Sequence, residues 1–174
     1  MKNKIIGLLL VSMAGAGWAS SGVAELKGTA PNSQIKGTVR LEDTPAGLSV
    51  KAQVVNVPPG THGFHIHEYG ACDDMAKAAG GHYNPFNMNH GDAVKAGIHH
   101  AHAGDLGNVT VDASGTGQVS VVIPGLTLSS GTYTVSGRSI VLHEKTDDLS
   151  SQPAGNAGNR IACGAILVVG SGAK

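Results

Sequence analysis

Two histidines placed two residues apart are the first sign of chemistry in this chain. His65 and His67 alternate with Phe64 and Ile66, and this alternation predicts a β-strand over 61–68. Side chains at positions i and i+2 of a strand share a face, so the two imidazoles are expected side by side. A lone pair of this kind is typical of an exposed strand edge, but it is also half of a metal site.

Most of the other histidines follow within one long segment, which favours the metal site. The further candidate ligands are His82, His90, His99, His100, His102, Asp105 and His143. Imidazole and carboxylate are common ligands of zinc and copper, and this clustering is hard to explain without metal. His62 shares a strand face with Phe64 and Ile66, so we interpret it as a structural histidine.

The chain begins with a pattern typical of a secretory signal peptide. Lys2 and Lys4 precede an apolar run over 5–11, and small residues follow up to Ala19. The apolar run is too short to span a membrane. We expect cleavage of residues 1–19, or alternatively a cut after Ala24, which leaves one exported domain over 20–174 with no membrane attachment. The other interpretation is an uncleaved anchor.

Charge argues against a nucleic-acid partner. The chain has 12 basic and 12 acidic residues. Residues 1–19 hold two of the basic residues and none of the acidic ones, so the mature domain is slightly acidic. It has no surplus of Lys and Arg to neutralise phosphates.

The two cysteines predict a disulfide, because an even pair in an exported chain is usually oxidised. Cys72 and Cys163 are far apart in the sequence. A bond between them would constrain the unfolded chain by roughly 4–5 kcal/mol in the chain-entropy account. Two thiolate ligands on zinc are the weaker alternative, since neither cysteine belongs to a CxxC pair.

The rest of the chain predicts an all-β domain. Turn-rich breaks separate eight candidate strands over 23–29, 34–41, 47–55, 60–67, 105–112, 117–123, 139–143 and 160–169. Their number and spacing favour an eight-stranded sandwich or flattened barrel. Two long loops interrupt the pattern, over 68–103 and 144–159, and the first includes a possible helical turn over 73–79. Loops of this length are usually functional.

Five segments resemble motifs of one family, the copper/zinc superoxide dismutases, and in particular its bacterial exported type. They are 63–68 (GFHIHE), 80–85 (GGHYNP), 102–108 (HAGDLGN), 143–149 (HEKTDDL) and 155–164 (GNAGNRIACG). Together they extend over essentially the whole mature chain. The resemblance implies an eight-stranded Greek-key barrel with long metal-binding and active-site loops.

The resemblance also implies which residues hold each metal. Copper is expected on His65, His67, His82 and His143, and zinc on His82, His90, His102 and Asp105. Four imidazoles suit Cu(II), and three imidazoles with one carboxylate suit structural zinc. A shared His82 would lose both ring protons, which two neighbouring divalent cations favour. His102 is preferred to its rival His99, because the following GDLG sequence sets the register.

Three further features complete the implied site. Asp147 matches a carboxylate that links a copper histidine to a zinc histidine. Arg160 matches the active-site arginine, whose rigid guanidinium attracts and orients superoxide. A bond between Cys72 and Cys163 would tie the strand of Arg160 to the long loop. No other steering charge is identified, because the loop over 149–155 is shorter than in the cytosolic eukaryotic members.

The implied activity is disproportionation of superoxide to dioxygen and hydrogen peroxide by Cu(II)/Cu(I) cycling, with His82 and Arg160 in catalytic roles and zinc in a structural one. The alternatives are a periplasmic copper or zinc carrier on the same fold and a purely structural sandwich. The complete ligand set and Arg160 favour the enzyme. We expect a periplasmic protein whose partner is superoxide, and a monomer or a homodimer.

Overall fold

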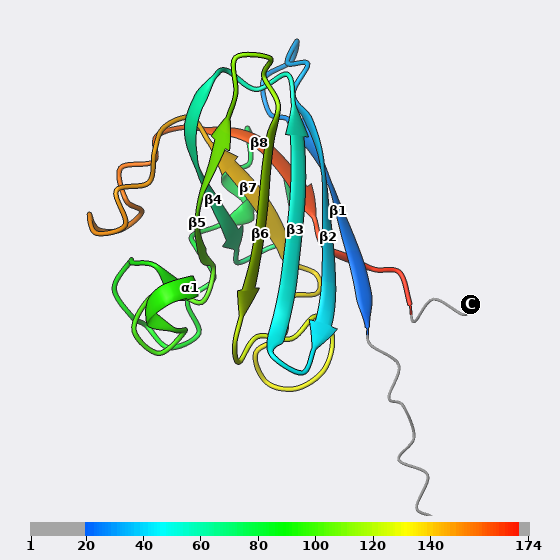
Figure 1. The fold of residues 1–174 in the computed structure, drawn as a ribbon, viewed down its shortest axis with the longest axis vertical. Coiled ribbons are helices and arrows are strands. Elements are labelled where there is room, and N and C mark those ends of the chain that lie inside the picture. Colours follow the sequence, from blue (N-terminus) through cyan, green and yellow to red (C-terminus); the bar gives the residue numbers. More distant parts are fainter. Residues whose placement is uncertain (1–19, 171–174) are drawn as a thin grey trace, which may run out of the picture.

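The computed structural model describes residues 20–170, which form an all-β fold of nine strands (Figure 1). The strands are β1 (Ser21–Gly28), β2 (Lys36–Thr44), β3 (Gly47–Val55), β4 (Gly60–His67), β5 (Asp105–Val111), β6 (Gly117–Ile123), β7 (Ser139–His143), β8 (Arg160–Ala165) and β9 (Leu167–Val168). A 3₁₀ turn, η1 (Lys77–Ala79), and a short helix, α1 (Ala93–Ala96), lie in the first long loop.

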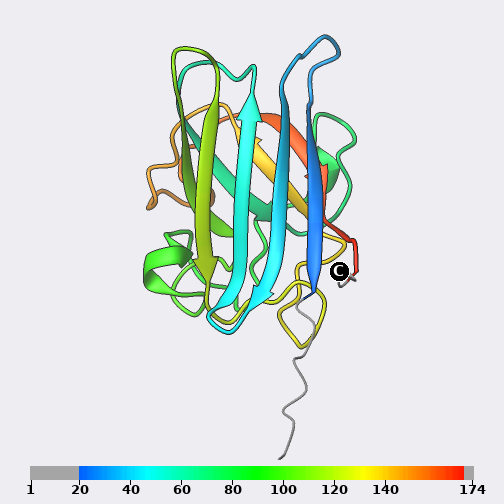
Figure 2. The ribbon, with the colours of Figure 1, turned by 45° about the vertical axis from the view of Figure 1, so that its right-hand side comes forward.

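The strands close into a flattened barrel. Their order is β2-β3-β6-β5-β4-β7-β8-β1-β9, and β1 also pairs with β2, which completes the closure. β4, β5 and β6 are successive neighbours with β3 beside β6, which is a Greek-key arrangement. Figure 2 shows β1, β2, β3 and β6 side by side as one face of the barrel. The predicted all-β Greek-key barrel is confirmed, with β9 as an additional short strand.

Alternation along the strands with one solvent-facing side, such as β3, separates the core from the surface. In β3, Leu48, Val50 and Val54 are fully buried, whereas Lys51 and Gln53 are exposed. Burying a side chain such as Leu or Val stabilises the fold by roughly 1.5–3 kcal/mol relative to leaving it in water. A one-residue slip would expose this whole set, so the core also fixes the strand register.

All eight predicted strands are present, with ends that shift by a few residues, but the last one is interrupted. The backbone N–H of Ile166 donates to the carbonyl of Arg138 at 2.8 Å, and the Ile166 side chain is buried. The chain therefore leaves the ladder at this residue and continues as β9 against β1.

Two local details of the first long loop differ from the sequence expectation. The helical turn predicted over 73–79 is right-handed only in η1, because Asp74, Met75 and Ala76 have φ of 49°, 52° and 62°. The helix α1 was not predicted. It has four residues, too few to show a helical apolar period, and it is capped by Asp92, whose side chain accepts from the N–H of Lys95 at 3.1 Å.

Within residues 20–170 no helix has the length and apolar character needed to cross a membrane.

The predicted disulfide is present. Cys72 and Cys163 are joined with Cα atoms 5.7 Å apart, and neither belongs to a group of candidate metal ligands in the described chain. Cys163 packs with Ala76, Ala79 and Val141 in a small second core, to which Cys72 adds a half-buried side chain. The bond thus holds the first long loop against β8.

We expect no reactive thiol in the denatured, unreduced protein, because the chain's two cysteines are joined. Thiol titration in denaturant should find none before reduction and both cysteines afterwards. Two reactive thiols in a freshly purified, unreduced sample would contradict the bond.

Candidate metal centres

β4 holds His65 and His67 on the side away from the core. Phe64 and Ile66 are fully buried in the main hydrophobic core, which fixes the inward face of the strand. The two histidines therefore point outwards. The long loops cover them, so both are 0% exposed although they lie outside the barrel.

Four histidines converge beside this face of β4. This four-histidine group consists of His65, His67, His82 and His143, all buried, with ligand atoms that lie within 4.8 Å of one another. His82 reaches the group through a single antiparallel bridge to His67. His143 ends β7, the strand beside β4, and its Nε2 lies 3.3 Å from Nε2 of His67.

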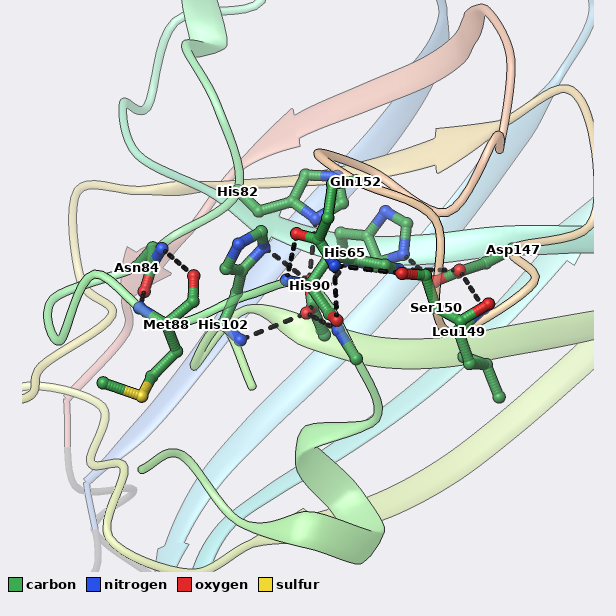
Figure 3. Close-up of polar contacts among 12 residues, drawn as sticks. His65, His82, Asn84, Met88, His90, His102, Asp147, Leu149, Ser150 and Gln152 are labelled. Atoms are coloured by element: carbon green, nitrogen blue, oxygen red, sulfur yellow. Dashed lines mark hydrogen bonds and ion pairs between the residues drawn. The ribbon is translucent and has the colours of Figure 1, made fainter. Parts of the chain in front are cut away.

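A second set of ligands lies next to the first. This three-histidine group consists of His82, His90, His102 and Asp105, all buried and again within 4.8 Å of one another. Asp105 is the first residue of β5. Its Oδ1 lies 2.7 Å from Nδ1 of His82, and its Oδ2 lies 3.0 Å from Nδ1 of His90. The carboxylate therefore lies where the three imidazoles meet, and Figure 3 shows these three rings, His82, His90 and His102, close together.

His82 belongs to both groups and offers one ring nitrogen to each. Its Nδ1 faces Asp105 in the three-histidine group. Its ring centroid lies 4.0 Å from that of His65 in the four-histidine group. This is the placement that an imidazole bridging two cations requires.

Unpaired buried nitrogens test whether the two groups fit metal ions. Four ring nitrogens are buried without a hydrogen-bond partner: His65 Nδ1, His82 Nε2, His90 Nδ1 and His102 Nδ1. The last two lie near Asp105 at ion-pair distance but outside hydrogen-bond geometry. An unpaired buried polar atom costs roughly 1–3 kcal/mol. One cation in each group would pair all four nitrogens, so the residues fit two metal ions.

Three members of the four-histidine group, His67, His82 and His143, are held in the neutral form that binds metal. Burial, followed by repulsion from His65, lowers the pKa of His82 to about 4 and that of His143 to about 3. Burial, together with the nearby His82, holds the pKa of His67 far below its usual value. Near neutral pH these imidazoles carry no charge, so a cation need not displace their protons.

The three-histidine group is different because it contains a carboxylate. Burial lowers the pKa of His90, but the nearby carboxylates of Asp105 and Asp147 outweigh burial and raise it to about 9. Burial would raise the pKa of Asp105, but its contacts with His102 and His82 hold that pKa well below its usual range. Asp105 is therefore ionised where a cation would bind, and a bound cation would take the place of the proton that Asp105 and Asp147 favour on His90.

Asp147 connects the two groups. Its Oδ2 lies 2.7 Å from Nε2 of His65, and its Oδ1 lies 2.8 Å from Nε2 of His90 (Figure 3). These contacts outweigh burial and hold the pKa of Asp147 below its usual range. A proton kept on each Nε2 leaves the Nδ1 lone pair free for a metal. The link implied by the resemblance is present in the structure.

Two supporting residues were missed by the sequence reasoning. The side chain of Asn108 donates to the carbonyl of Asp147 at 3.0 Å and accepts from its N–H at 2.8 Å. Gln152 holds the backbone of His90 in the same way, with bonds of 2.8 and 3.1 Å. Asn108 lies in the HAGDLGN segment and could have been noticed there, whereas nothing in the sequence around Gln152 pointed to His90.

The remaining histidines lie outside both groups. His62 is buried, with its two ring nitrogens 2.9 Å from the carbonyl of His143 and 2.8 Å from that of Pro58. His99 and His100 are exposed, and the His99 ring packs against Phe86 at a tilt of 54°, with centroids 4.2 Å apart. The structure thus brings His102, and neither of its neighbours, into the three-histidine group.

Arg160 lies at the start of β8 and is hydrogen-bonded to the disulfide loop, which is the part of the first long loop from Cys72 to Gly80. Its Nη1 and Nη2 donate to the carbonyls of Ala76 and Gly80. The Gly80 carbonyl also lies 3.0 Å from Nδ1 of His67, so one backbone oxygen joins the guanidinium to the four-histidine group. Burial lowers the pKa of Arg160, but guanidinium remains charged in proteins.

A hollow of about 510 Å³ opens beside Arg160. It is lined by Thr29, Ala30, Met75, Lys77, Gly158, Asn159, Arg160 and Ile161. Lys77 and Met75 were not singled out from the sequence, because no motif of the disulfide loop places them beside the arginine. Lys77 is exposed and lies 3.5 Å from Asp74, so its charge is partly compensated.

Comparison with known proteins agrees with this geometry. A sequence model of the copper/zinc superoxide dismutase family matches residues 35–166. An extracellular superoxide dismutase [Cu-Zn] of Caenorhabditis elegans is 41% identical over 79% of this chain, and the match spans 63% of that longer relative. Superoxide dismutase [Cu-Zn] 2 of Aquifex aeolicus is 37% identical over 95% of this chain and 98% of its own length.

A solved structure has the same fold. The crystal structure of the clock protein EA4 superposes with a TM-score of 0.75 at 34% identity, covering 89% of this chain and 98% of that one. The chain therefore belongs to the copper/zinc superoxide dismutase family, which uses copper and zinc to convert superoxide to dioxygen and hydrogen peroxide.

Proposed function

We propose that this chain disproportionates superoxide, with copper in the four-histidine group and zinc in the three-histidine group. The observation that carries this division is His82, which offers one ring nitrogen to each group. When bound, copper supplies one-electron chemistry by cycling between Cu(II) and Cu(I), and zinc supplies a fixed charge without redox change.

The protein's residues prepare the site for that chemistry. Asp147 fixes the tautomers of His65 and His90, so that each presents its Nδ1 lone pair. His82 Nε2 releases and accepts a proton during each cycle, which provides a proton for the peroxide product. Zinc bound by the three-histidine group would hold the His82 ring in place while this proton moves.

Arg160 binds and orients the substrate anion. Two of its N–H groups are used by the carbonyls of Ala76 and Gly80, which fix the direction of the guanidinium. The N–H groups that remain are available to superoxide entering the adjoining hollow. A carrier protein on this fold would need the histidines, but it would not need a positively charged side chain such as Arg160 beside an open hollow. For this reason we favour the enzyme.

Metal analysis of the purified protein, with a superoxide assay before and after chelation, tests the proposal. We expect about one copper and one zinc per chain, activity that chelation removes, and activity that added copper restores. Protein loaded with both metals but without activity would favour the carrier instead.

We also propose that the protein is exported to the periplasm after cleavage at Ala19. Residues 1–19 lie outside the described residues, so the proposed cleavage is supported by their basic and apolar sequence pattern. Relatives from Caenorhabditis elegans and Brugia pahangi that bear the name extracellular agree with export. The alternative cut after Ala24 would remove half of β1, including the fully buried Ala24. Whether the mature enzyme is a monomer or a homodimer remains a prediction, as does the lack of nucleic-acid and membrane partners.

The exported protein should lack tryptophan, because Trp18 is the only tryptophan of the chain and lies within the predicted signal peptide. Fluorescence excited beyond the tyrosine band should show no indole emission, and the intact mass should be that of a chain that begins at Ser20. Indole emission from the exported form would show that the leader is retained.

A further inference from the structure

Met75 occupies an unusual backbone position in the disulfide loop. It is the middle of three consecutive non-glycine residues with left-handed φ, namely Asp74, Met75 and Ala76. For such residues this conformation costs roughly 1–2 kcal/mol each. The turn is held because the N–H of Ala76 donates to the carbonyl of Cys72 at 3.1 Å, and because the Ala76 side chain is fully buried beside the disulfide.

The same turn directs the Met75 side chain outwards. Its exposed fraction is 55%, although the next residue is completely buried. Met75 and Arg160 both line the hollow beside β8. The carbonyl of Ala76, one residue further on, accepts a hydrogen bond from Arg160. A thioether therefore lies in the hollow through which, on the proposed function, superoxide enters and peroxide leaves.

We propose that Met75 is a peroxide-sensitive modification site that regulates Arg160. A sulfur lone pair attacks one oxygen of hydrogen peroxide, the O–O bond breaks and an S–O bond forms. The sulfur loses two electrons, and the departing hydroxide takes up a proton to become water. One thioether and one hydrogen peroxide thus give one sulfoxide and one water, and the oxidant is the product of the family's own reaction.

Oxidation of Met75 would weaken the binding of superoxide by Arg160, and this consequence rests on the proposed function. A sulfoxide oxygen is a strong hydrogen-bond acceptor, whereas a thioether sulfur is a weak one. In the shared hollow it competes with superoxide for the free N–H groups of the guanidinium. Oxidation should therefore lower activity without removing either metal.

The chain contains a matched control in Met88, the other methionine within residues 20–170. Met88 is only half-buried, but it lies in the loop before His90 and outside the hollow. Its backbone N–H and carbonyl are both bound by the side chain of Asn84 at 2.9 Å (Figure 3). If exposure alone decided oxidation, both methionines would react. Only Met75 is placed to affect Arg160.

The test treats the metal-loaded enzyme with hydrogen peroxide and locates each added oxygen by peptide mass. Wild type, Met75→Leu and Met88→Leu are compared after their metal content and melting temperature have been checked. Wild type and Met88→Leu should gain one oxygen at Met75 and lose activity by roughly two- to tenfold, which does not exceed the roughly tenfold lower limit for electrostatic steering. Methionine sulfoxide reductases should restore this activity while the disulfide stays intact, and Met75→Leu should resist the reversible loss.

Three results would overturn the proposal. Met88 could be oxidised while Met75 is spared, or the Met75 sulfoxide could form with no change in activity. Alternatively, Met75→Leu could lose the same activity irreversibly, which would place the damage on the metal-binding histidines. An untreated enzyme that carries both metals but has no activity would instead refute the proposed function, and the mass measurement at Met75 would still be interpretable.

Discussion

His65→Ala should nearly abolish superoxide turnover and leave zinc in place, whereas His90→Ala should lose zinc and keep part of the turnover. Removal of His65 deletes one nitrogen from the four-histidine group and none from the three-histidine group. We expect activity to fall by more than roughly a hundredfold, because even the outer partners of metal-ligating histidines contribute about 10–100-fold. Zinc content should stay near that of the wild type.

His90→Ala removes a ligand from the three-histidine group only. Zinc should be lost and the melting temperature should fall, since a ligand that binds the native state stabilises it by mass action. Part of the activity should survive, because His65, His67, His82 and His143 all remain. Metal content, melting temperature and turnover of both variants are the measurements.

His99→Ala is the matched control for these two variants. His99 is a histidine of the same loop region, but it is exposed and packs against Phe86. The His99→Ala variant should keep both metals and full activity. If His90→Ala lost copper and kept zinc, the division of the ligands would be wrong. Loss of zinc in His99→Ala would return that residue to the candidate ligands in place of His102.

Arg160→Ala should lower activity about tenfold while both metals stay bound, and activity should depend less on ionic strength because a steering charge is gone. The structure also predicts a modest loss of stability, since two charge-assisted hydrogen bonds to the carbonyls of Ala76 and Gly80 disappear. Salt-dependent turnover rates, metal analysis and thermal unfolding of the variant are the measurements.

Arg160→Lys separates attraction from orientation. Lysine keeps the charge but lacks the rigid fork that contacts both carbonyls. We expect the salt dependence of the wild type with an activity between those of the wild type and Arg160→Ala. If Arg160→Ala matched the wild type in both rate and salt dependence, Arg160 would have no part in the reaction.

The sequence alone determined the features that depend on local geometry. Alternating side chains placed the strands, because neighbouring residues of a strand point to opposite faces. The same rule put His65 and His67 together on the outer face of β4, opposite Phe64 and Ile66, and the structure has them there. The disulfide could also be predicted from the sequence, because a chain with two cysteines offers each of them only one partner.

Only the tertiary structure decided the features that depend on how the long loops fold back. The family resemblance already preferred His102 to His99 through the GDLG register, but no periodicity of the sequence did so. In the structure His102, and not His99, lies with Asp105 and His82. Likewise, the carbonyls that hold Arg160 come from residues some 80 positions away. Loop conformation is set by long-range packing, by the disulfide and by left-handed backbone at non-glycine residues, and none of these leaves a periodic signal in the sequence.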